Sequence, residues 1–453
     1  MTITLDNMLN GHRAAFPDAG PASLCRAPGR VNLIGEHLDY NGLPVLPMAI
    51  DRAIYLAFSP REDNLIQLRN RDRAFAPADF RNTAAIEPSQ RGAWENYCKA
   101  AIVGLNAHFH PERYAGMDLY VDGDIPSGAG LSSSSALVVA TALAYLSVLG
   151  KKLEQDITRL ELATLLAEAE QYVGTRGGGM DQAVILLGRR NHACMIHFFP
   201  LRVTHVPVFS DHAFVVCNSL VKAHKTGAML ERYNEGPLTC RLLRAVIEQQ
   251  AREDYDDDLR IDRLADLWYG PLGLTHEEAA YLIERATPDE AVGLAWIAQR
   301  LGAPEETLRQ DGFKELVEPP GGFLLRTRAR HQITEHQRVE AARDCLLADD
   351  PKGFGAAMYH SHWSCAEDYR VSCPELDAMV HTAQAAGAMG ARMTGAGFGG
   401  CTVNLVAPEQ LGRFQETMHR QYYQNNGFPL DDIDSAFLPV RSADWADYMV
   451  QER

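Results

Sequence analysis

The sequence lacks several patterns that would assign it to a common functional class. No uninterrupted apolar stretch is long enough to cross a bilayer, and no GxxxxGKS or GxxxxGKT motif is present, which excludes a P-loop. None of the nine cysteines forms a CxxC pair, so we expect reduced, mostly buried thiols rather than a disulfide framework or a cysteine zinc site. The formal charge is −16 without any basic block, which argues against nucleic acid and anionic membranes as partners.

The composition is that of an ordinary globular protein. The length of 453 residues and the 46% hydrophobic content predict two or three domains with a large core. Residues 213–217 and 401–406 are typical of strands and alternate with helical patterns, which indicates an α/β or α+β protein. We place the domain boundary after Cys217, giving residues 1–217 and 218–453. Because residues 1–7 contain no basic segment followed by an apolar core, we expect a cytoplasmic protein.

Two helical segments carry further expectations. The apolar residues between Leu162 and Val173 fall on one helical face, which we expect to pack on a sheet. Residues from about 250 to 311 are acidic and helical, and Thr275 to Glu278 form a capping-box pattern. The simplest interpretation of this second segment is a solvated helical insertion.

The most informative segment is the glycine- and serine-rich run Pro126 to Ala136, which leads directly into the apolar residues 137–143. Glycines let the backbone approach an anion, serines supply hydroxyls, and the first amides of a following helix point toward negative charge. The alternative is a flexible linker, but linkers seldom lead into so apolar a helix. The run therefore predicts a phosphate-binding loop.

Polar side chains also cluster between Arg26 and Gly42, where Arg30, Glu36, His37 and Asp39 lie among glycines and a proline. So many donors and acceptors beside tight turns suit a polyhydroxy ligand, although each residue alone would be an ordinary surface residue.

Two further glycine-rich segments complete the pattern. Asp181 follows the glycine turn in residues 174–182; it can act on a hydroxyl during phosphoryl transfer or serve merely as a helix cap. The loop Met393 to Cys401 precedes a strand and carries no assignment by itself. These glycine-rich segments matter only if the fold brings them together.

With these motifs in place, the sequence resembles the galactokinase family of the GHMP kinase superfamily. Residues 30–41, RVNLIGEHLDYN, resemble the galactokinase signature, residues 126–136 resemble the phosphate-binding motif, and residues 393–401 resemble the third motif. Weaker matches lie at residues 94–97, 326–331 and 368–377. The resemblance implies an α+β, two-lobed fold. Its N-terminal lobe resembles ribosomal protein S5 domain 2, its C-terminal lobe has ferredoxin-like βαβ character, and the site lies between them.

The resemblance also implies a role for each matched residue. Asp181 matches the catalytic aspartate and Arg30 the arginine that stabilises it and the transferring group. Ser134 matches the Mg²⁺-ligating serine, and Glu170 is the nearest candidate for the second Mg²⁺ ligand, with Glu168 as the alternative. The matched sugar-binding positions are Glu36, His37, Asp39, Gly178 and Tyr233. The matched ATP-binding positions are Pro126, Ser127, Gly128, Ala129, Gly130, Leu131, Ser132, Ser133, Ser134, Ser135 and Ala136.

The implied activity is ATP- and Mg²⁺-dependent phosphorylation of the anomeric hydroxyl of D-galactose. Another galactose-type sugar such as galacturonate stays open as the substrate, and so do two more specific alternatives. Gly177, Gly178 and Gly179 replace a bulkier triplet and resemble the N-acetylgalactosamine kinase branch, so we expect them to leave room for an acetamide at C2. A non-catalytic galactose and ATP sensor is the other, but the uninterrupted serine run and Asp181 favour an enzyme. The partners are a small sugar and MgATP; the oligomeric state stays open.

Overall fold

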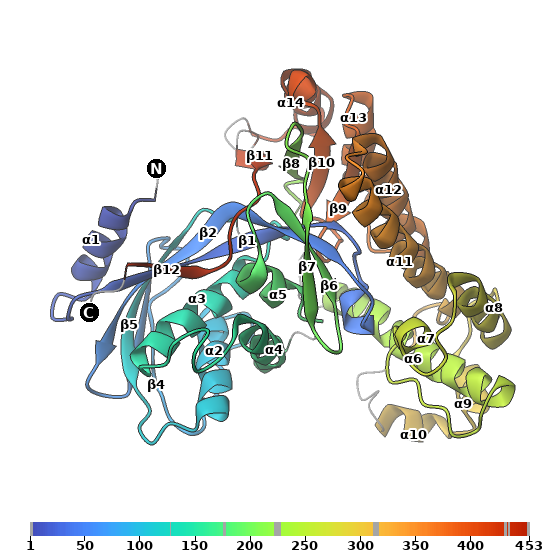
Figure 1. Cartoon of the computed structure of the whole chain (residues 1–453), viewed down its shortest axis with the longest axis horizontal. Helices are drawn as coiled ribbons and strands as arrows, with labels where there is room; N and C mark the ends of the chain where they lie inside the picture. The colour runs from blue at the N-terminus through green and yellow to red at the C-terminus, as the bar shows by residue number, and fades with distance from the viewer. Residues whose placement is uncertain are drawn as a thin grey trace.

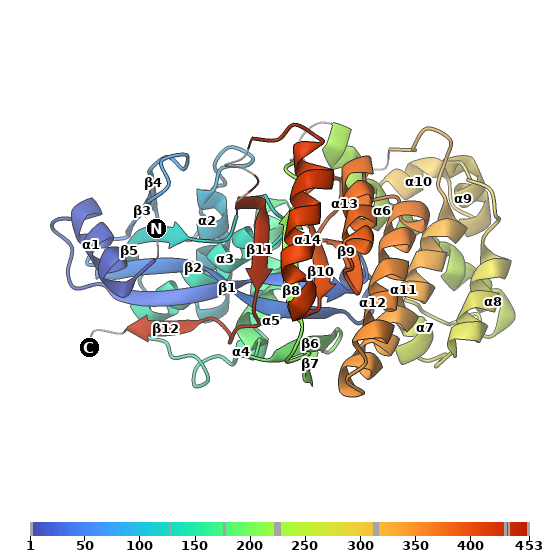
Figure 2. The same cartoon turned by 90° about the horizontal axis from the view of Figure 1, so that it is seen from above.

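A computed structural model describes residues 3–126, 128–174, 178–221, 228–310, 317–429, 433 and 435–450. Figure 1 shows an elongated molecule with a large sheet at one end and a group of helices at the other. A smaller sheet and its helices lie between these two ends in both Figure 1 and Figure 2. None of the helices in these residue ranges is long and apolar enough to cross a membrane.

The larger sheet has six strands in the order β12-β1-β2-β5-β3-β4, with only β3 and β5 parallel. The strands are β1 (Ser23–Ile34), β2 (Leu46–Arg61), β3 (Leu65–Asn70), β4 (Ala78–Arg81), β5 (Gly116–Gly123) and β12 (Asp447–Val450). Helix α1 (Leu5–Ala15) contacts β2 and β5. A separate hairpin pairs β6 (His192–His197) with β7 (Arg202–Pro207).

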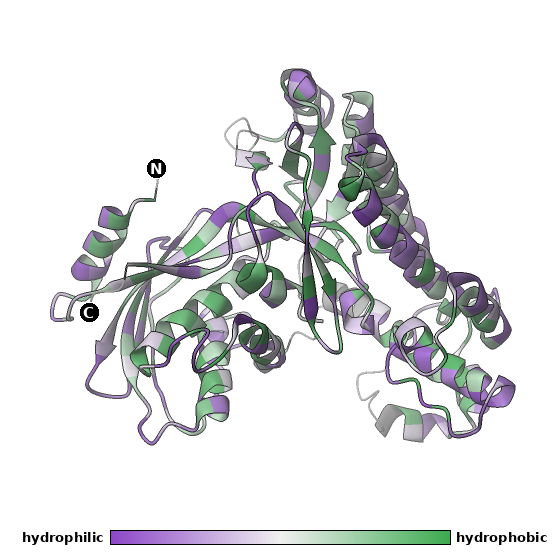
Figure 3. Ribbon diagram, viewed as in Figure 1, coloured by the Kyte–Doolittle hydropathy of each residue, from purple (hydrophilic) through white to green (hydrophobic). Residues whose placement is uncertain are grey.

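Four helices lie on one side of this sheet: α3 (Ser133–Val148) and α5 (Met180–Leu187) contact its strands, while α2 (Glu95–Phe109) and α4 (Arg159–Ala169) pack on α3 and α5, respectively. Every residue of α3 from Ser135 to Leu146 is buried, so this helix is apolar all round, as Figure 3 shows. The buried face of α4 packs mainly against α2 and α5. The expectation that it lies on a sheet was therefore wrong, because the helices beside it take that place.

The smaller sheet is antiparallel in the order β11-β8-β10-β9. Its strands are β8 (Ala213–Asn218), β9 (Gly390–Thr394), β10 (Cys401–Val406) and β11 (Phe437–Val440). The two predicted strands are therefore confirmed. Packed around them are α12 (Pro351–Trp363), α13 (Pro374–Ala385) and α14 (Leu411–Met418).

The two sheets do not separate at residue 217. Strand β8, which that division assigns to the first lobe, pairs with β10 and β11 of the second. The chain then returns, and β12 pairs with β1 at one edge of the larger sheet (Figure 2). A boundary chosen from position along the chain cannot show either pairing, because tertiary contacts decide which strands pair.

The far end of the molecule is helical, as the sequence predicts. It contains α6 (Ala228–Asp254), α7 (Asp266–Tyr269), α8 (His276–Ala286), α9 (Leu294–Leu301), α10 (Glu305–Gln310) and α11 (Leu325–Leu347). The predicted capping box is present, since Thr275 and Glu278 bond each other's backbone amides. The acidic segment is more than a solvated insertion, because Ile261, Ile283 and Ile297 are buried in a hydrophobic cluster that also includes residues of α6 and α11. The remaining helical turns are Asp39–Asn41, Glu170–Val173, Ser364–Asp368, Pro408–Gln410 and His419–Gln424.

Candidate active site

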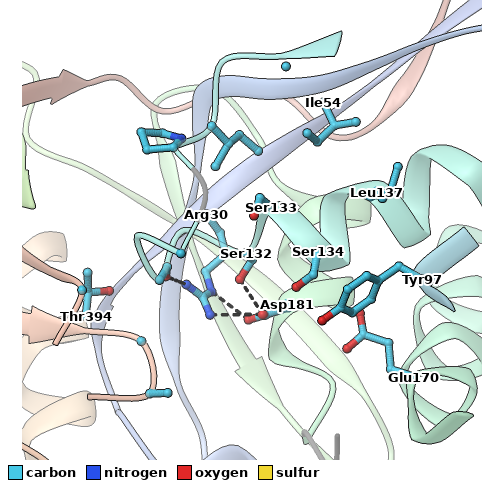
Figure 4. Close-up of a pocket in the computed structure, with 18 of the residues that line it drawn as sticks. Arg30, Ile54, Tyr97, Ser132, Ser133, Ser134, Leu137, Glu170, Asp181 and Thr394 are labelled. Carbon is cyan, nitrogen blue, oxygen red and sulfur yellow. Dashed lines mark hydrogen bonds and ion pairs between the residues drawn. The ribbon is translucent and has the colours of Figure 1, made fainter. Parts of the chain in front are cut away.

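A cleft of about 800 Å³ brings the glycine-rich segments together. Its lining includes Arg30 and Asp39 from the first segment, Asp181 from α5, and residues of the phosphate loop and of the loop between β9 and β10 (Figure 4). From these two loops the lining residues include Gly128, Gly130, Ser132, Ser133, Ser134, Thr394, Gly395, Ala396, Gly397, Gly399 and Gly400. The fold therefore brings these segments, which lie far apart in sequence, to one cleft.

The phosphate loop turns into α3 through left-handed backbone. Gly128, Gly130 and Ser132 have φ of 72°, 74° and 58°, and Ser132 is the N-cap residue of α3. A Cβ on Gly130 would lie 3.0 Å from the Thr394 carbonyl oxygen, so this loop and the loop after β9 pack back to back. The first amides of α3 therefore border the cleft, where an anion would be favoured. Ser127 lies outside the described residues.

Asp181 and Arg30 form an ion pair in this cleft (Figure 4). Arg30 Nε donates to Asp181 Oδ1 at 2.7 Å, Arg30 Nη2 donates to Oδ2 at 3.1 Å, and the Ser132 hydroxyl also donates to Oδ2. Burial opposes the charge of Arg30, but Asp181 and then Glu36 more than offset it, so the pKa of Arg30 is raised. The side chain of Arg30 is 8% exposed and that of Asp181 is 25% exposed, so the carboxylate is the partner that a ligand can reach.

Glu36 connects the first segment to the third motif. Its Oε1 accepts from the Gly395 amide at 2.7 Å and from Arg392 Nη1 at 3.3 Å. Arg392 is fully buried and Glu36 is 3% exposed. Because one carboxylate oxygen already has two donors, Glu36 holds the two segments together as well as lining the cleft.

His37 and Asp39 occupy the adjacent wall. His37 stacks on Tyr369 at 4.8 Å between ring centroids, and burial lowers its pKa to about 3, so its imidazole is neutral at physiological pH. Asp39 accepts from the Gly178 amide at 3.0 Å. Burial, followed by the charge of Asp181, raises the pKa of Asp39 to about 6. The charge of Asp181 therefore favours the protonated form of Asp39.

Helix α11 holds this wall from behind through backbone contacts. Glu335 Oε1 accepts from the Gly35 amide at 2.9 Å, His331 Nε2 lies 3.0 Å from the Glu36 carbonyl oxygen, and Gln332 Nε2 donates to the His37 carbonyl at 3.0 Å. All three α11 side chains are buried. They determine where residues 35–37 lie, because a buried polar contact that is broken is costly.

Three oxygen-bearing side chains meet on the other side of Asp181. Ser134 and Glu170 both line the cleft, and the Tyr97 hydroxyl lies beside them (Figure 4). Burial and then the charge of Glu170 raise the pKa of Tyr97, while a hydrogen bond with Ser134 opposes that shift. Glu168 is exposed on α4, so this geometry favours Glu170 as the acidic partner of Ser134.

The cleft extends to an end where apolar and aromatic side chains lie beside polar ones such as Asn70 and Asp72. The Phe75 and Trp94 rings meet edge to face at 6.1 Å, and Trp94 Nε1 donates to the Ala76 carbonyl at 2.9 Å. The apolar residues that line this end are Ile54, Phe75, Trp94, Val121, Ile125 and Leu137.

Comparisons with known proteins agree with this geometry. Residues 10–60 match the galactokinase galactose-binding signature, residues 96–189 the GHMP kinases N terminal domain, and residues 342–424 the GHMP kinases C terminal domain. The galactokinase of Roseiflexus sp. strain RS-1 is 36% identical over 414 residues, covering 90% of this chain and 89% of that protein. The galactokinase of Dictyostelium discoideum is 31% identical, covering 93% of this chain and 86% of that protein. This chain belongs to the galactokinase family.

Comparison with solved structures agrees with this assignment to the galactokinase family. The Lactococcus lactis galactokinase complexed with galactose has a TM-score of 0.76 and 28% identity, covering 98% of this chain and 99% of that one. The Methanococcus jannaschii mevalonate kinase has a TM-score of 0.58 and 16% identity, and it shows the shared GHMP kinase fold alone. The predicted two-lobed α+β fold is confirmed.

Sequence reasoning missed several residues of this galactokinase-family site. Arg392 and Glu335 are buried ions that no motif includes, so nothing in the sequence marks them. Trp94 and Tyr97 lie in one of the weaker family matches, and that signal pointed to them. Tyr233, in contrast, was predicted from the sequence. Its backbone belongs to α6, but its side chain lies outside the described residues.

Proposed function

We propose that this chain transfers the terminal phosphoryl group of ATP to the anomeric hydroxyl of D-galactose and releases galactose 1-phosphate and ADP. One observation carries the proposal: the Asp181 carboxylate faces the cleft between the start of α3 and the wall formed by residues 36–39. A phosphate at α3 and a sugar at that wall would meet at Asp181.

The chemistry then needs no covalent intermediate. Asp181 accepts the proton of the anomeric hydroxyl, or stabilises that hydroxyl electrostatically, as it attacks the terminal phosphorus. Arg30, held by Asp181 and by the Gly130 carbonyl, provides positive charge beside the transferring group. The Ser132 hydroxyl also donates to Asp181, so the carboxylate is positioned before substrates bind.

We assign Mg²⁺ to Ser134 and Glu170. The donors that meet beside Tyr97 are all oxygens, which is the donor type that this hard cation prefers, and Mg²⁺ is commonly held by one or two protein oxygens together with water and substrate phosphates. The bound ion would neutralise phosphate charge. This set has no nitrogen or sulfur ligand that would favour a softer metal.

We assign the sugar to the wall that holds Glu36, His37 and Asp39, with Tyr233 as a further candidate. A neutral imidazole and two carboxylates supply acceptors for sugar hydroxyls, while His37 stacked on Tyr369 is held in a single orientation. The amide of Gly178 is already used by Asp39, so we assign Gly178 to orienting that carboxylate. The Lactococcus lactis galactokinase, which is similar over the whole chain, was solved with galactose.

We assign the adenine base to the apolar end of the cleft near Phe75 and Trp94. Aromatic side chains provide a surface on which a purine can stack. Residues 126–136 would then follow the triphosphate from this end toward Asp181.

The glycine triplet supports a backbone role rather than room for an acetamide. A Cβ on Gly178 would lie 2.3 Å from the Asp39 carbonyl carbon, and a Cβ on Gly179, which has φ of 94°, would lie 3.1 Å from the Ala167 Cβ on α4. Both directions lead into protein. Gly177 lies outside the described residues. We therefore favour galactose over N-acetylgalactosamine.

The test is an ADP-release assay of the purified chain with ATP, Mg²⁺ and a panel of free sugars, followed by phosphorus NMR of the product. We expect galactose to be the best substrate, with the phosphate on the anomeric oxygen. Binding of galactose and ATP without ADP release would establish the sensor alternative. A higher kcat/KM on N-acetylgalactosamine than on galactose would establish the N-acetylgalactosamine kinase alternative. If the protein binds neither sugar, both kinase assignments are refuted.

A further inference from the structure

Two histidines and a glutamate converge outside the cleft, where α8 meets α11. His276 is the first residue of α8, and His336 and Glu340 lie one turn apart on α11. His276 Nε2 lies 3.0 Å from Glu340 Oε2, and His336 Nε2 lies 3.6 Å from Glu340 Oε1. One ligand atom from each residue can be chosen so that all three lie within 4.8 Å of one another. None of these residues lines the phosphoryl-transfer cleft.

The spacing of these atoms fits a tetrahedral ion. Zinc binds imidazole nitrogen and carboxylate oxygen at about 2.0–2.1 Å, so two ligand atoms on a tetrahedron lie about 3.3 Å apart. The nitrogen–oxygen separations of 3.0 Å, to Glu340 Oε2, and 3.6 Å, to Glu340 Oε1, lie on either side of that value. Ligands four residues apart on one helix face also occur in known zinc sites. Small side-chain movements would therefore complete the site.

The burial of the cluster also suits a bound ion. The side chain of His336 is 1% exposed, so the residues around it hold the imidazole in place. Glu340 is 38% exposed, so an ion can reach the cluster from solvent.

The neighbours of the cluster determine which ion would bind. The Tyr269 hydroxyl lies 2.8 Å from His336 Nε2. When an ion binds, this hydroxyl would either move away from the nitrogen or become the fourth ligand of the ion. Arg343 and Arg202 act electrostatically on Tyr269, so two guanidinium groups lie near the cluster. Nearby guanidinium groups and the single carboxylate disfavour a hard ion such as Mg²⁺, whereas two imidazoles favour Zn²⁺ or Co²⁺.

We propose that His276, His336 and Glu340 form a binding site for a first-row transition-metal ion such as Zn²⁺. The bound ion links α8 to α11, and α11 carries the side chains that hold residues 35–37 of the sugar-binding wall. The ion would therefore brace α8 against the helix that positions residues 35–37. This inference does not depend on the proposed function.

The test is a Co²⁺ titration of the chelator-treated protein, followed by visible absorption of the bound ion and by competition with Zn²⁺. We expect about one equivalent bound with the absorption of a tetrahedral nitrogen and oxygen site, and a higher melting temperature on adding Zn²⁺. His276→Ala and Glu340→Gln should each weaken binding by at least about tenfold. The matched control is His212→Ala, because His212 forms a two-residue pair with Asp211 at 2.7 Å.

A second variant and a second ion keep the outcome clear. His336→Gln preserves a partner for Tyr269 and should lose Co²⁺ binding while remaining folded by circular dichroism. Excess Mg²⁺ should not displace Co²⁺. The proposal is refuted if all variants bind Co²⁺ as the parent does, if the spectrum shows thiolate ligation by any of the nine cysteines, or if the parent binds no Co²⁺.

Discussion

Replacing Asp181 by asparagine removes the charge of the proposed catalytic carboxylate but keeps the size of the side chain. Both carboxylate oxygens face donors, with Arg30 Nε 2.7 Å from Oδ1 and Arg30 Nη2 3.1 Å from Oδ2. Either orientation of the new amide therefore places an N–H group against the guanidinium. We expect turnover to fall by about 10²–10⁴, the range for loss of a positioned general base.

The same change should lower stability by a smaller amount. Breaking a fully buried ion pair costs about 3–5 kcal/mol, but Asp181 is 25% exposed and Glu36 still acts on Arg30, so we expect about 1–3 kcal/mol. The matched control is Asp118→Asn, which breaks another Arg–Asp pair, with Arg61 at 3.0 Å, away from the cleft. It should lower stability without changing turnover.

The measurements are ADP release at saturating galactose and MgATP, galactose affinity by calorimetry, and urea denaturation of both variants. For Asp181→Asn we expect a large fall in turnover with galactose affinity changed by less than about threefold, because the sugar contacts that we propose lie mainly at residues 36–39. Turnover within about tenfold of the parent would show that Asp181 is not the catalytic group. An equal loss of turnover in Asp118→Asn would show that the effect is one of stability.

Three further predictions follow from the other contacts in the cleft. Ser134→Ala should raise the Mg²⁺ concentration needed for half-maximal ADP release while leaving galactose KM unchanged, and a Mg²⁺ titration that overlays those of the parent and Ser133→Ala would exclude it as a ligand. Asp39 has a folded pKa of about 6 against an ordinary 3.8, so between about pH 6 and 4 its carboxyl group is protonated in the folded protein and charged in the unfolded chain. We therefore expect kcat/KM for galactose to fall below pH 6, while the contribution of Asp39 to the free energy of unfolding rises. Asp39→Asn should remove that limb of the pH profile, and an unchanged limb would assign it to another group. Gly179→Ile should lower kcat/KM on galactose and N-acetylgalactosamine by similar factors, since φ of 94° strains a branched side chain by about 1–3 kcal/mol; a loss confined to the acetamide sugar would restore a C2 selectivity role.

Much of the local structure could be predicted from the sequence because it depends on near neighbours. The apolar run after Pro126 to Ala136 predicts a helix that begins at a phosphate loop, and α3 begins at Ser133. Thr275 and Glu278 form the predicted cap, and residues 213–217 and 401–406 lie in β8 and β10. Periodicity, capping and turn chemistry act over a few residues, so they can be detected in a linear pattern.

The site itself depended on contacts that no short window contains. Arg30 and Asp181 are 151 residues apart, and Glu36 reaches Arg392 across 356 residues. Family resemblance anticipated the first pair, but a buried arginine or glutamate outside a motif looks like any surface ion until its burial is known.

What the sequence determined by itself is therefore the α+β class, the glycine-rich segments and the chemistry that their side chains can perform. Only the tertiary structure decided that β8 pairs with β10, a strand from the second half of the chain, and that α4 packs on other helices. It also decided that a Cβ on Gly178 or Gly179 would point into protein. The physical reason is the same in each case. Strand pairing, helix packing and burial are set by which surfaces meet in space, whereas sequence patterns record only the local preferences of the chain.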